Sequence, residues 1–386
     1  MIRRTLFWCH LLLGLAAALP VLAMSISGLL LVFQPQILAF AEGGARKVSV
    51  PTSGKPLHLD AVVLQAAGPL EPKVSALAIA ADPAVALELR AGRDLTLWAD
   101  PFTGASTGQS GSVPAFMKQI ETLHRWLGNR GIGGLVTGVS VLFCLVLSLT
   151  GLVLWWPRSL KAMANVVLPK RGLTGRARDW QWHNAVGFLV LPLFVVLSLT
   201  GTIMSWKWAE TALYVSVGSE PPRPSAPPKT TGRNPSAPAK PESATGREGA
   251  ALDRSAPRTW QVWFDTVVAH APVGWDRIVL QAPEGSKGAS ATVLLPGQGR
   301  RQASSILLAP DGTFKEFKPG RSDAGTRLRD LVRPLHTGEL FGVVGQILVA
   351  SATLGVLVLV WTGMALSWRR FRRWRGRNPN QPLPSP

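Results

Sequence analysis

The sequence predicts a membrane protein whose all-α core contains four transmembrane helices arranged as a two-fold internal repeat, with two small α+β modules outside the membrane. Three observations predict this fold class. Four long runs contain no Lys, Arg, Asp or Glu, namely 11–33, 132–156, 184–206 and 343–366. Each run exceeds the roughly 20 helical residues that a bilayer core requires. Basic residues cluster beside particular ends of these runs, and the order of elements in the first half of the chain recurs in the second.

These observations divide the chain into consecutive segments. Helices are expected at 1–33, 131–157, 181–208 and 336–368, the extramembrane modules at 34–130 and 258–335, a proline-rich spacer at 209–257, a basic loop at 158–180 and a basic tail at 369–386. The first helix could be mistaken for a secretory signal, because Arg3 and Arg4 precede it. Its apolar run is longer than that of a signal, so we expect the helix to be retained.

Basic residues beside the helix ends predict the orientation. They precede the first helix, lie between the second and third, and follow the fourth: Arg3, Arg4, Arg158, Lys161, Lys170, Arg171, Arg176, Arg178, Arg369, Arg370, Arg372, Arg373, Arg375 and Arg377. We therefore expect a bacterial inner-membrane protein with both termini in the cytoplasm and both modules in the periplasm. This topology and the anionic lipid bilayer account for much of the net charge of +19, so no nucleic-acid partner is predicted.

Each extramembrane module is expected to combine one helix with three antiparallel strands. The first has an amphipathic helix at 57–67 and β-like runs at 73–80, 84–90 and 94–99. The second has a helix at 258–270 and β-like runs at 276–282, 290–296 and 303–309. The stretch 219–257 is rich in Pro, Ser and Ala and is expected to be a disordered spacer, with a docking segment for a partner as the alternative.

Four of the six histidines recur at matched spacings. Each precedes a hydroxyl–glycine pair, by 17 residues in two cases and by 26 in the other two: His10 to Ser27-Gly28, His183 to Thr200-Gly201, His124 to Thr150-Gly151 and His336 to Thr362-Gly363. Unconstrained polar residues at a membrane interface would not repeat in this way. The spacing is the strongest functional signal in the sequence.

The predicted topology sorts these histidines by depth. His10 and His183 open the first and third helices on the cytoplasmic side, whereas His124 and His336 lie on the periplasmic side. Two histidines from separate helices can supply both axial ligands of an iron porphyrin, so we predict two bis-histidine b haems. A zinc or copper site is the competing interpretation, but two histidines make an incomplete zinc shell. Simple polar anchoring at the interface is the other alternative.

Other residues near these histidines are weaker candidates. Arg125 and Arg333 outside, and Arg3, Arg4 and Arg178 inside, could bind haem propionates or be snorkelling charges. Gly14, Gly128 and Gly187 could make room for a flat macrocycle or for close helix packing. The remaining candidates have ordinary interpretations: Cys9 and Cys144 as buried small apolar residues, His58 and His270 as surface or core histidines, and most of the 15 tryptophans as an aromatic belt.

Several of these stretches resemble the PepSY-associated transmembrane family, which includes iron-regulated membrane proteins and periplasmic ferric-siderophore reductases of the ferrioxamine-reductase type. The resemblance is carried by FWCHLLLG, LHRWLG with SLTGLVLWWPR, WHNAVGF with SLTGTIMSW, and RPLHTGELFG with VWTGMALSWRR. The modules, which end in ADPFTG and APDG, look like PepSY domains. In reductases of this family two b haems carry electrons to siderophore-bound ferric iron, and His10, His124, His183 and His336 match the family's histidine positions. The proline-rich insert and a degenerate second module depart from its pattern.

We therefore expect a two-haem transmembrane electron carrier that acts as a ferric-siderophore reductase, with no side chain serving as acid, base or nucleophile. Its partners would be an unidentified cytoplasmic or membrane electron donor and a periplasmic ferric chelate. Two other functions remain open. One is a non-redox PepSY protein that binds or regulates a partner. The other is a small-solute transporter, for which the matched Pro20 and Pro192 are the best support.

Overall fold

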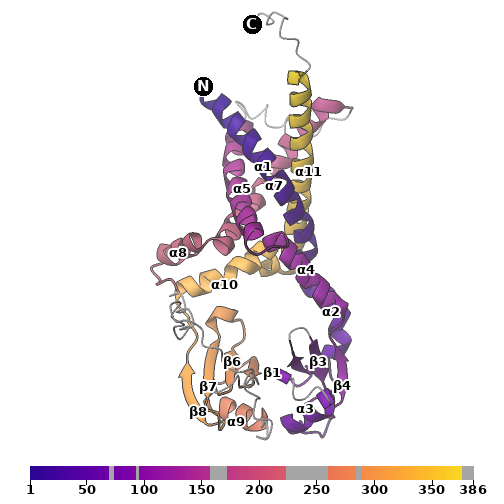
Figure 1. The fold of residues 1–386 in the computed structure, drawn as a ribbon, viewed down its shortest axis with the longest axis vertical. Coiled ribbons are helices and arrows are strands. Elements are labelled where there is room, and N and C mark those ends of the chain that lie inside the picture. Colours follow the sequence, from indigo (N-terminus) through magenta and orange to yellow (C-terminus); the bar gives the residue numbers. More distant parts are fainter. Residues whose placement is uncertain (69–73, 93–94, 157–171, 223–259, 284–287, 376–386) are drawn as a thin grey trace, which may run out of the picture. The chain divides into compact units, whose positions relative to one another are not determined.

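The computed structural model describes residues 1–68, 74–92, 95–156, 172–222, 260–283 and 288–375 (Figure 1). The chain forms two compact units. The helical unit contains Met1–Phe40, Ser112–Leu213 and Leu328–Pro386, and the sheet unit contains Ala41–Gly111 and Tyr214–Arg327. Most of the expected basic loop and spacer, and the end of the expected basic tail, lie outside the described residues.

Among the described residues, four helices of the helical unit are long and apolar enough to cross a membrane. They are α1 (Ile2–Val32), α5 (Ile132–Trp155), α7 (Gly175–Ser205) and α11 (Gly342–Arg375). Helices α1 and α7 each pack against both α5 and α11, so the four form a bundle in which α1 and α7 are diagonal neighbours. The prediction of four spanning helices is confirmed in length and composition. Helices α1 and α7 also continue without a break through Pro20 and Pro192.

The bundle interior is built from small and hydroxyl-bearing residues, which allow close packing between spanning helices. Ala17, Val21, Cys144 and Val356 form an apolar cluster inside it. Cys144 is buried, as predicted. The prediction for Cys9 is wrong, because its position on α1 leaves it exposed.

Four shorter helices flank the spans: α2 (Gln34–Arg46), α4 (Ser112–Trp126), α8 (Lys207–Ser216) and α10 (Ala324–Thr337). The sequence placed His336 at the start of the fourth span, but it lies on α10, and α11 begins only at Gly342. Gly338 and Gly342 separate the two helices because both have positive φ, at 79° and 61°. Likewise, α4 ends before Leu127 and Gly128, whose φ values are 45° and 83°. Helix α8 occupies part of the segment expected to be spacer.

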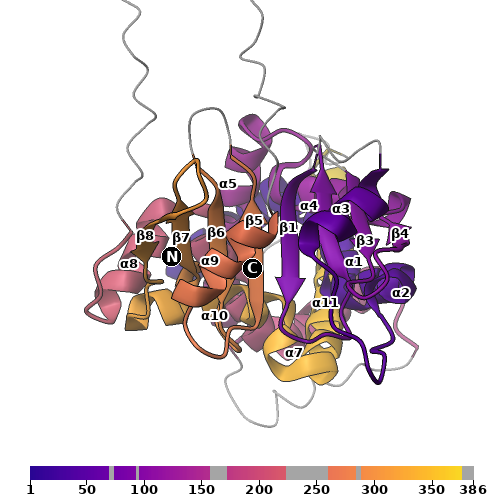
Figure 2. The ribbon, with the colours of Figure 1, turned by 90° about the horizontal axis from the view of Figure 1, so that it is seen from below.

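The sheet unit contains one antiparallel sheet with the order β4-β3-β2-β1-β5-β6-β7-β8 (Figure 2). The first four strands are β1 (Val74–Ala80), β2 (Leu87–Ala91), β3 (Leu95–Ala99) and β4 (Ser106–Gln109). The last four are β5 (Arg277–Gln281), β6 (Ser290–Leu294), β7 (Ser304–Leu308) and β8 (Phe314–Lys318). Strands β1 and β5 join the two sets, with Ala78 opposite Val279 at the middle of the pair.

Two helices, α3 (Leu59–Ala67) and α9 (Trp260–His270), cover one face of this sheet (Figure 2). Alternate strand residues such as Leu77, Leu89 and Ile278 point into the core beneath them. Both helices lie where the sequence predicted. The expectation of three strands in each module is wrong: the described residues give each half four strands, and the two sets join in one sheet. Strands β4 and β8 were missed because β4 has no apolar residue and every residue of β8 is exposed.

Candidate functional site

The structure brings the four repeated histidines together in the two expected pairs. The ring centres of His10 on α1 and His183 on α7 are 6.3 Å apart. Those of His124 on α4 and His336 on α10 are 6.4 Å apart. We call these the His10–His183 site and the His124–His336 site. The first lies between the diagonal helices of the bundle, and the second between two of the flanking helices.

Each of these histidines contacts a hydroxyl group on a different helix through its ring nitrogen Nδ1. The Nδ1–hydroxyl distances are 2.9 Å for His10 and Thr150, 2.9 Å for His183 and Thr362, 2.8 Å for His336 and Thr200, and 3.2 Å for His124 and Ser27. The sequence had matched each histidine with the hydroxyl that follows it on the chain. The structure instead exchanges these partners: Ser27 of α1 holds His124, and Thr150 of α5 holds His10.

The hydrogen bonds of the hydroxyl groups define which ring nitrogen carries the proton. Each hydroxyl donates to the carbonyl oxygen four residues earlier in its own helix: Ser27 to Ala23 at 2.7 Å, Thr150 to Val146 at 2.8 Å, Thr200 to Val196 at 2.7 Å and Thr362 to Val358 at 2.7 Å. A hydroxyl has one proton, so in its contact with the imidazole the hydroxyl oxygen accepts the hydrogen bond. Nδ1 therefore carries the hydrogen, and Nε2 keeps a free lone pair. In His124 the carbonyl of Met24, 2.8 Å from Nδ1, requires the same tautomer.

The glycine after each hydroxyl makes room for the imidazole ring. A Cβ atom at Gly28, Gly151 or Gly363 would lie 3.2, 3.3 or 3.4 Å from the Cε1 atom of the neighbouring histidine. At Gly201 the distance to His336 Cε1 would be 3.7 Å. The repeated hydroxyl–glycine pair thus acts as a cradle, in which the hydroxyl orients the ring and the missing side chain lets it approach.

The separation of the paired rings fits one metal ion between them. An imidazole nitrogen lies about 1.1 Å from its ring centre and metal–imidazole bonds measure about 2.0–2.1 Å, so two rings in line on one metal ion have centres about 6.2–6.4 Å apart. A direct hydrogen bond of about 2.9 Å between the nitrogens would reduce this distance to about 5.1 Å. The observed 6.3 and 6.4 Å match the first arrangement.

The donor set favours a macrocyclic metal group over a bare ion. Among the described residues, no group of three or more His, Cys, Asp or Glu side chains is placed to hold a metal. Two imidazoles alone leave a zinc shell incomplete, whereas they complete the axial coordination of haem iron. Burial lowers the pKa of His124, and mainly burial lowers the pKa of His336 to about 4, so both rings are neutral and able to ligate at pH 7. The residues present therefore fit haem.

The basic residues expected near the sites have varied surroundings. Arg125 binds Glu121 at 2.8 Å and lies over the Trp126 ring. Arg333 is one turn before His336 on α10. Arg178 binds Asp179, and Arg3 donates to the carbonyl of Leu154 at 3.3 Å, beside the end of α5.

The three candidate glycines and two remaining histidines have structural roles. Cβ atoms at Gly14 and Gly187 would lie 3.7 and 3.5 Å from leucine side chains of neighbouring helices, which favours the helix-packing interpretation. Gly128 forms the turn after α4. His58 is exposed and contacts Asp60, and His270 stacks on Phe314, as expected for ordinary surface histidines.

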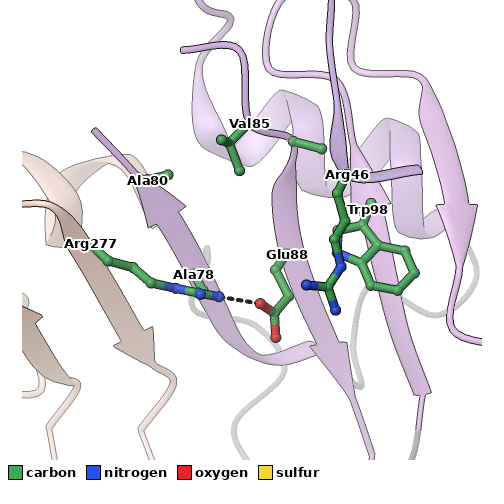
Figure 3. A pocket seen from close by; sticks show the side chains of 8 residues that line it. Arg46, Ala78, Ala80, Val85, Glu88, Trp98 and Arg277 are labelled. Atoms are coloured by element: carbon green, nitrogen blue, oxygen red, sulfur yellow. Dashed lines mark hydrogen bonds and ion pairs between the residues drawn. The ribbon is translucent and has the colours of Figure 1, made fainter. Parts of the chain in front are cut away.

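A hollow of about 70 Å³ lies on the face of the sheet opposite α3 and α9 (Figure 3). Arg277 of β5 reaches across the alanines of β1 to pair with Glu88, and Arg46 lies over the Trp98 ring at 5.4 Å. Sequence reasoning missed these residues. Their only signal is that polar residues alternate with the apolar residues of the strands and so lie on the face away from the core. The hollow is far smaller than the roughly 300–1,000 Å³ of small-molecule pockets, and Glu88 is already paired. We interpret it as a brace between the two halves of the sheet.

The sequence comparisons identify the family of the chain. No curated protein matches it. The family model described as "PepSY-associated TM region" matches residues 7–370, a range that contains all four histidines and the whole sheet. The chain belongs to the PepSY-associated TM region family.

Proposed function

We propose that the protein carries electrons across the bacterial inner membrane through two b haems, one at the His10–His183 site and one at the His124–His336 site. The acceptor is ferric iron held by a periplasmic siderophore, which makes the protein a ferric-siderophore reductase. The observation that carries this proposal is the paired geometry. The four Nδ1-protonated imidazoles form two pairs, and the distance between ring centres in each pair is that of two imidazoles bound to one metal ion.

The positions of the sites along the helices support transfer across a membrane. On α1, His10 belongs to one site and Ser27, which holds His124, belongs to the other. A helix rises about 1.5 Å per residue, so these positions differ by about 25 Å along the helix. A bilayer core is about 30 Å thick, so the two sites would lie near its opposite surfaces. The basic residues Arg369 to Arg375 at the end of α11 support a cytoplasmic location for the His10–His183 end.

The two-fold repeat is part of this proposal. The first site takes one histidine from α1 and one from α7, and the second takes one from α4 and one from α10. The order of strands is also symmetric about the β1–β5 pair, which is consistent with two PepSY-like halves fused into one sheet. If each half of the chain contributes one histidine to each site, a two-fold repeat of the halves produces both histidine pairs.

The side chains bind and orient in this proposal and take no part in bond making. The hydroxyl groups fix the tautomer of each imidazole, the glycines allow its approach, and the apolar cluster around Val21 and Cys144 excludes water between the sites. Haem supplies one-electron redox chemistry. Reduction releases the cargo, because ferrous iron binds the hard oxygen ligands of siderophores less tightly than ferric iron does.

The transporter alternative loses support, because α1 and α7 have no unwound segment at Pro20 or Pro192.

The test is purification in detergent from cells supplied with haem. The wild type should contain about two haems per chain by the pyridine haemochrome assay, and dithionite should produce b-type absorption bands. His124→Ala or His336→Ala should each remove one haem and leave the other, whereas the surface variant His270→Ala should keep both. Reconstituted vesicles with an internal reductant should then reduce an external ferric siderophore. A folded but colourless wild type would exclude the proposal and favour a non-redox binding or regulatory role.

A further inference from the structure

Trp155, at the end of α5, carries a buried indole N–H with no hydrogen-bond partner among the described residues. An unsatisfied buried donor is costly, and native proteins rarely leave one without an acceptor. The aromatic belt does not account for it, since a belt tryptophan directs its N–H towards water or lipid headgroups. The adjacent Trp156 fits that belt, with 65% of its surface exposed. The Trp155 N–H can therefore take an acceptor that the described residues do not supply.

The position of Trp155 places this donor beside the His10–His183 site. It lies one helical turn beyond Gly151, which faces the His10 ring, and so projects from the same side of α5. Its ring stacks on Phe188 of α7, with centres 4.1 Å apart and planes at 10°. The stack holds the indole between α5, whose Thr150 contacts His10, and α7, which carries His183. The donor thus sits on a packed ring and has no partner in the part of the chain that the structure describes.

A guanidinium lies at the same end of α5. Arg3 donates a hydrogen bond to the neutral carbonyl of Leu154, the residue before Trp155. Two other guanidiniums, of Arg178 and Arg369, are held by a carboxylate instead, because both pair with the buried Asp179, at 3.0 and 2.8 Å. A neutral N–H donor and an arginine beside it can together bind a carboxylate.

We propose that Trp155, assisted by Arg3, is a positioning residue that donates a hydrogen bond to a propionate carboxylate of the haem at the His10–His183 site. The inference rests on the proposed function and adds the orientation of the cofactor in its site. The propionate edge would face the same end of the bundle as the N-terminus of α1, and the opposite edge would face the apolar cluster around Val21 and Cys144.

The test compares haem loss from holoprotein variants that share the His124→Ala background, so that the remaining haem belongs to the His10–His183 site. Trp155→Phe retains an aromatic ring for the stack on Phe188 but lacks the N–H. Trp156→Phe is the matched control on the exposed neighbour. With apomyoglobin as scavenger, haem transfer should be roughly tenfold faster from the Trp155→Phe protein than from the control, in line with the loss of one hydrogen bond to a charged group. Arg3→Gln should accelerate the transfer to a smaller extent.

Reconstitution with haem dimethyl ester, in which both propionates are masked, separates a propionate contact from a general packing effect. The ester carbonyls accept only a weaker, neutral hydrogen bond, so the difference in rate between the Trp155→Phe protein and the control should shrink markedly for the ester. A Trp155→Phe effect of equal size with both forms of haem would overturn the inference, as would loss of native haem at the control rate. In the otherwise wild-type background, retention of the haem at the His124–His336 site shows that the variant is folded. A wild type without any haem would instead overturn the proposed function.

Discussion

Thr150 of α5 holds the imidazole of His10 on α1, with 2.9 Å between Oγ1 and Nδ1. Because the Thr150 hydroxyl donates its own proton to Val146, it accepts the hydrogen of His10 Nδ1. The contact therefore orients the ring and leaves Nε2 available as a ligand. The same relationship occurs at three other places, and each contact joins two different helices.

Replacement of this hydroxyl should weaken the site without disturbing the bundle. Thr150→Val keeps the side-chain shape but leaves the His10 Nδ1–H without its acceptor. We expect about 10–100-fold weaker haem retention at the His10–His183 site, the range typical of lost partners of metal-bound histidines. The measurement is haem transfer to a scavenger from the purified variant.

Two comparisons test the cause of that effect. Thr150→Ser should restore most of the retention. Thr202→Val should have little effect, because the Thr202 hydroxyl is also buried and makes the same kind of backbone bond, to the Ser198 carbonyl, but does not hold any of the four imidazoles. Equal losses from Thr150→Val and Thr202→Val would show that the contact with His10 has no special role.

A methyl group at Gly151 should displace the His10 ring. The added Cβ would lie 3.3 Å from His10 Cε1, closer than ordinary carbon contacts. Gly151→Ala should therefore change the low-spin electron paramagnetic resonance signal of the haem at that site. Gly14→Ala, whose Cβ would lie 3.7 Å from Leu147 Cδ2, is the matched control and should leave the signal unchanged. An unaltered spectrum in Gly151→Ala would show that the glycine is not part of the cradle.

The spans and the pairing of the histidines could be predicted from sequence because both depend on simple regularities. Apolar runs without charges define the spans, and equal spacings imply equal depths for His10 and His183 and for His124 and His336. The exchange of hydroxyl partners could not be predicted. The sequence shows that the spacing between His10 and Ser27 is repeated between His183 and Thr200. Only the packing of the bundle shows that Ser27 contacts His124 and not His10.

The sheet was harder to predict because its decisive contacts are non-local. The β1–β5 pair joins residues about 200 positions apart, such as Leu77 and Leu280. Local alternation identified the strands beneath α3 and α9 but gave no sign that the two halves share one sheet. The Trp155 donor was missed for a related reason, since two adjacent tryptophans both fit an aromatic belt until the burial of each is known.

The two helices on the sheet should depend on each other through their N-termini. Asp60 of α3 accepts the backbone N–H of Trp260 at 2.7 Å, and Gln261 of α9 accepts the backbone N–H of Leu59 at 2.9 Å. Each side chain thus caps the other helix, which is worth about 1 kcal/mol per cap. Asp60→Ala and Gln261→Ala should each lower the unfolding free energy of the sheet unit by roughly that amount in denaturant titrations.

The double variant tests whether these two caps act together. Because the capped ends lie side by side, loss of one cap should loosen the other, and the double variant should lose less than the sum of the single losses. Thr266→Ala, in the middle of α9, is the control and should have a smaller effect, because the Thr266 hydroxyl bonds to the Val262 carbonyl of its own helix. Strictly additive losses would indicate two independent caps.

Acid should weaken the start of α10, the helix that carries His336. Asp323 accepts the backbone N–H of Thr326 at 3.0 Å, the Thr326 hydroxyl at 2.9 Å and Arg321 Nε at 3.0 Å. The backbone hydrogen bond from Thr326 is the main cause that lowers the pKa of Asp323 to about 2. A carboxylate with a depressed pKa stabilises the folded state above its unfolded pKa of about 3.9, and this contribution disappears as the pH falls through the folded value. The difference in thermal unfolding temperature between the wild type and Asp323→Asn should therefore be constant from pH 7 to about pH 5 and shrink between about pH 5 and pH 2. A difference that stays constant down to pH 2 would mean that the charge of Asp323 does not stabilise the helix start.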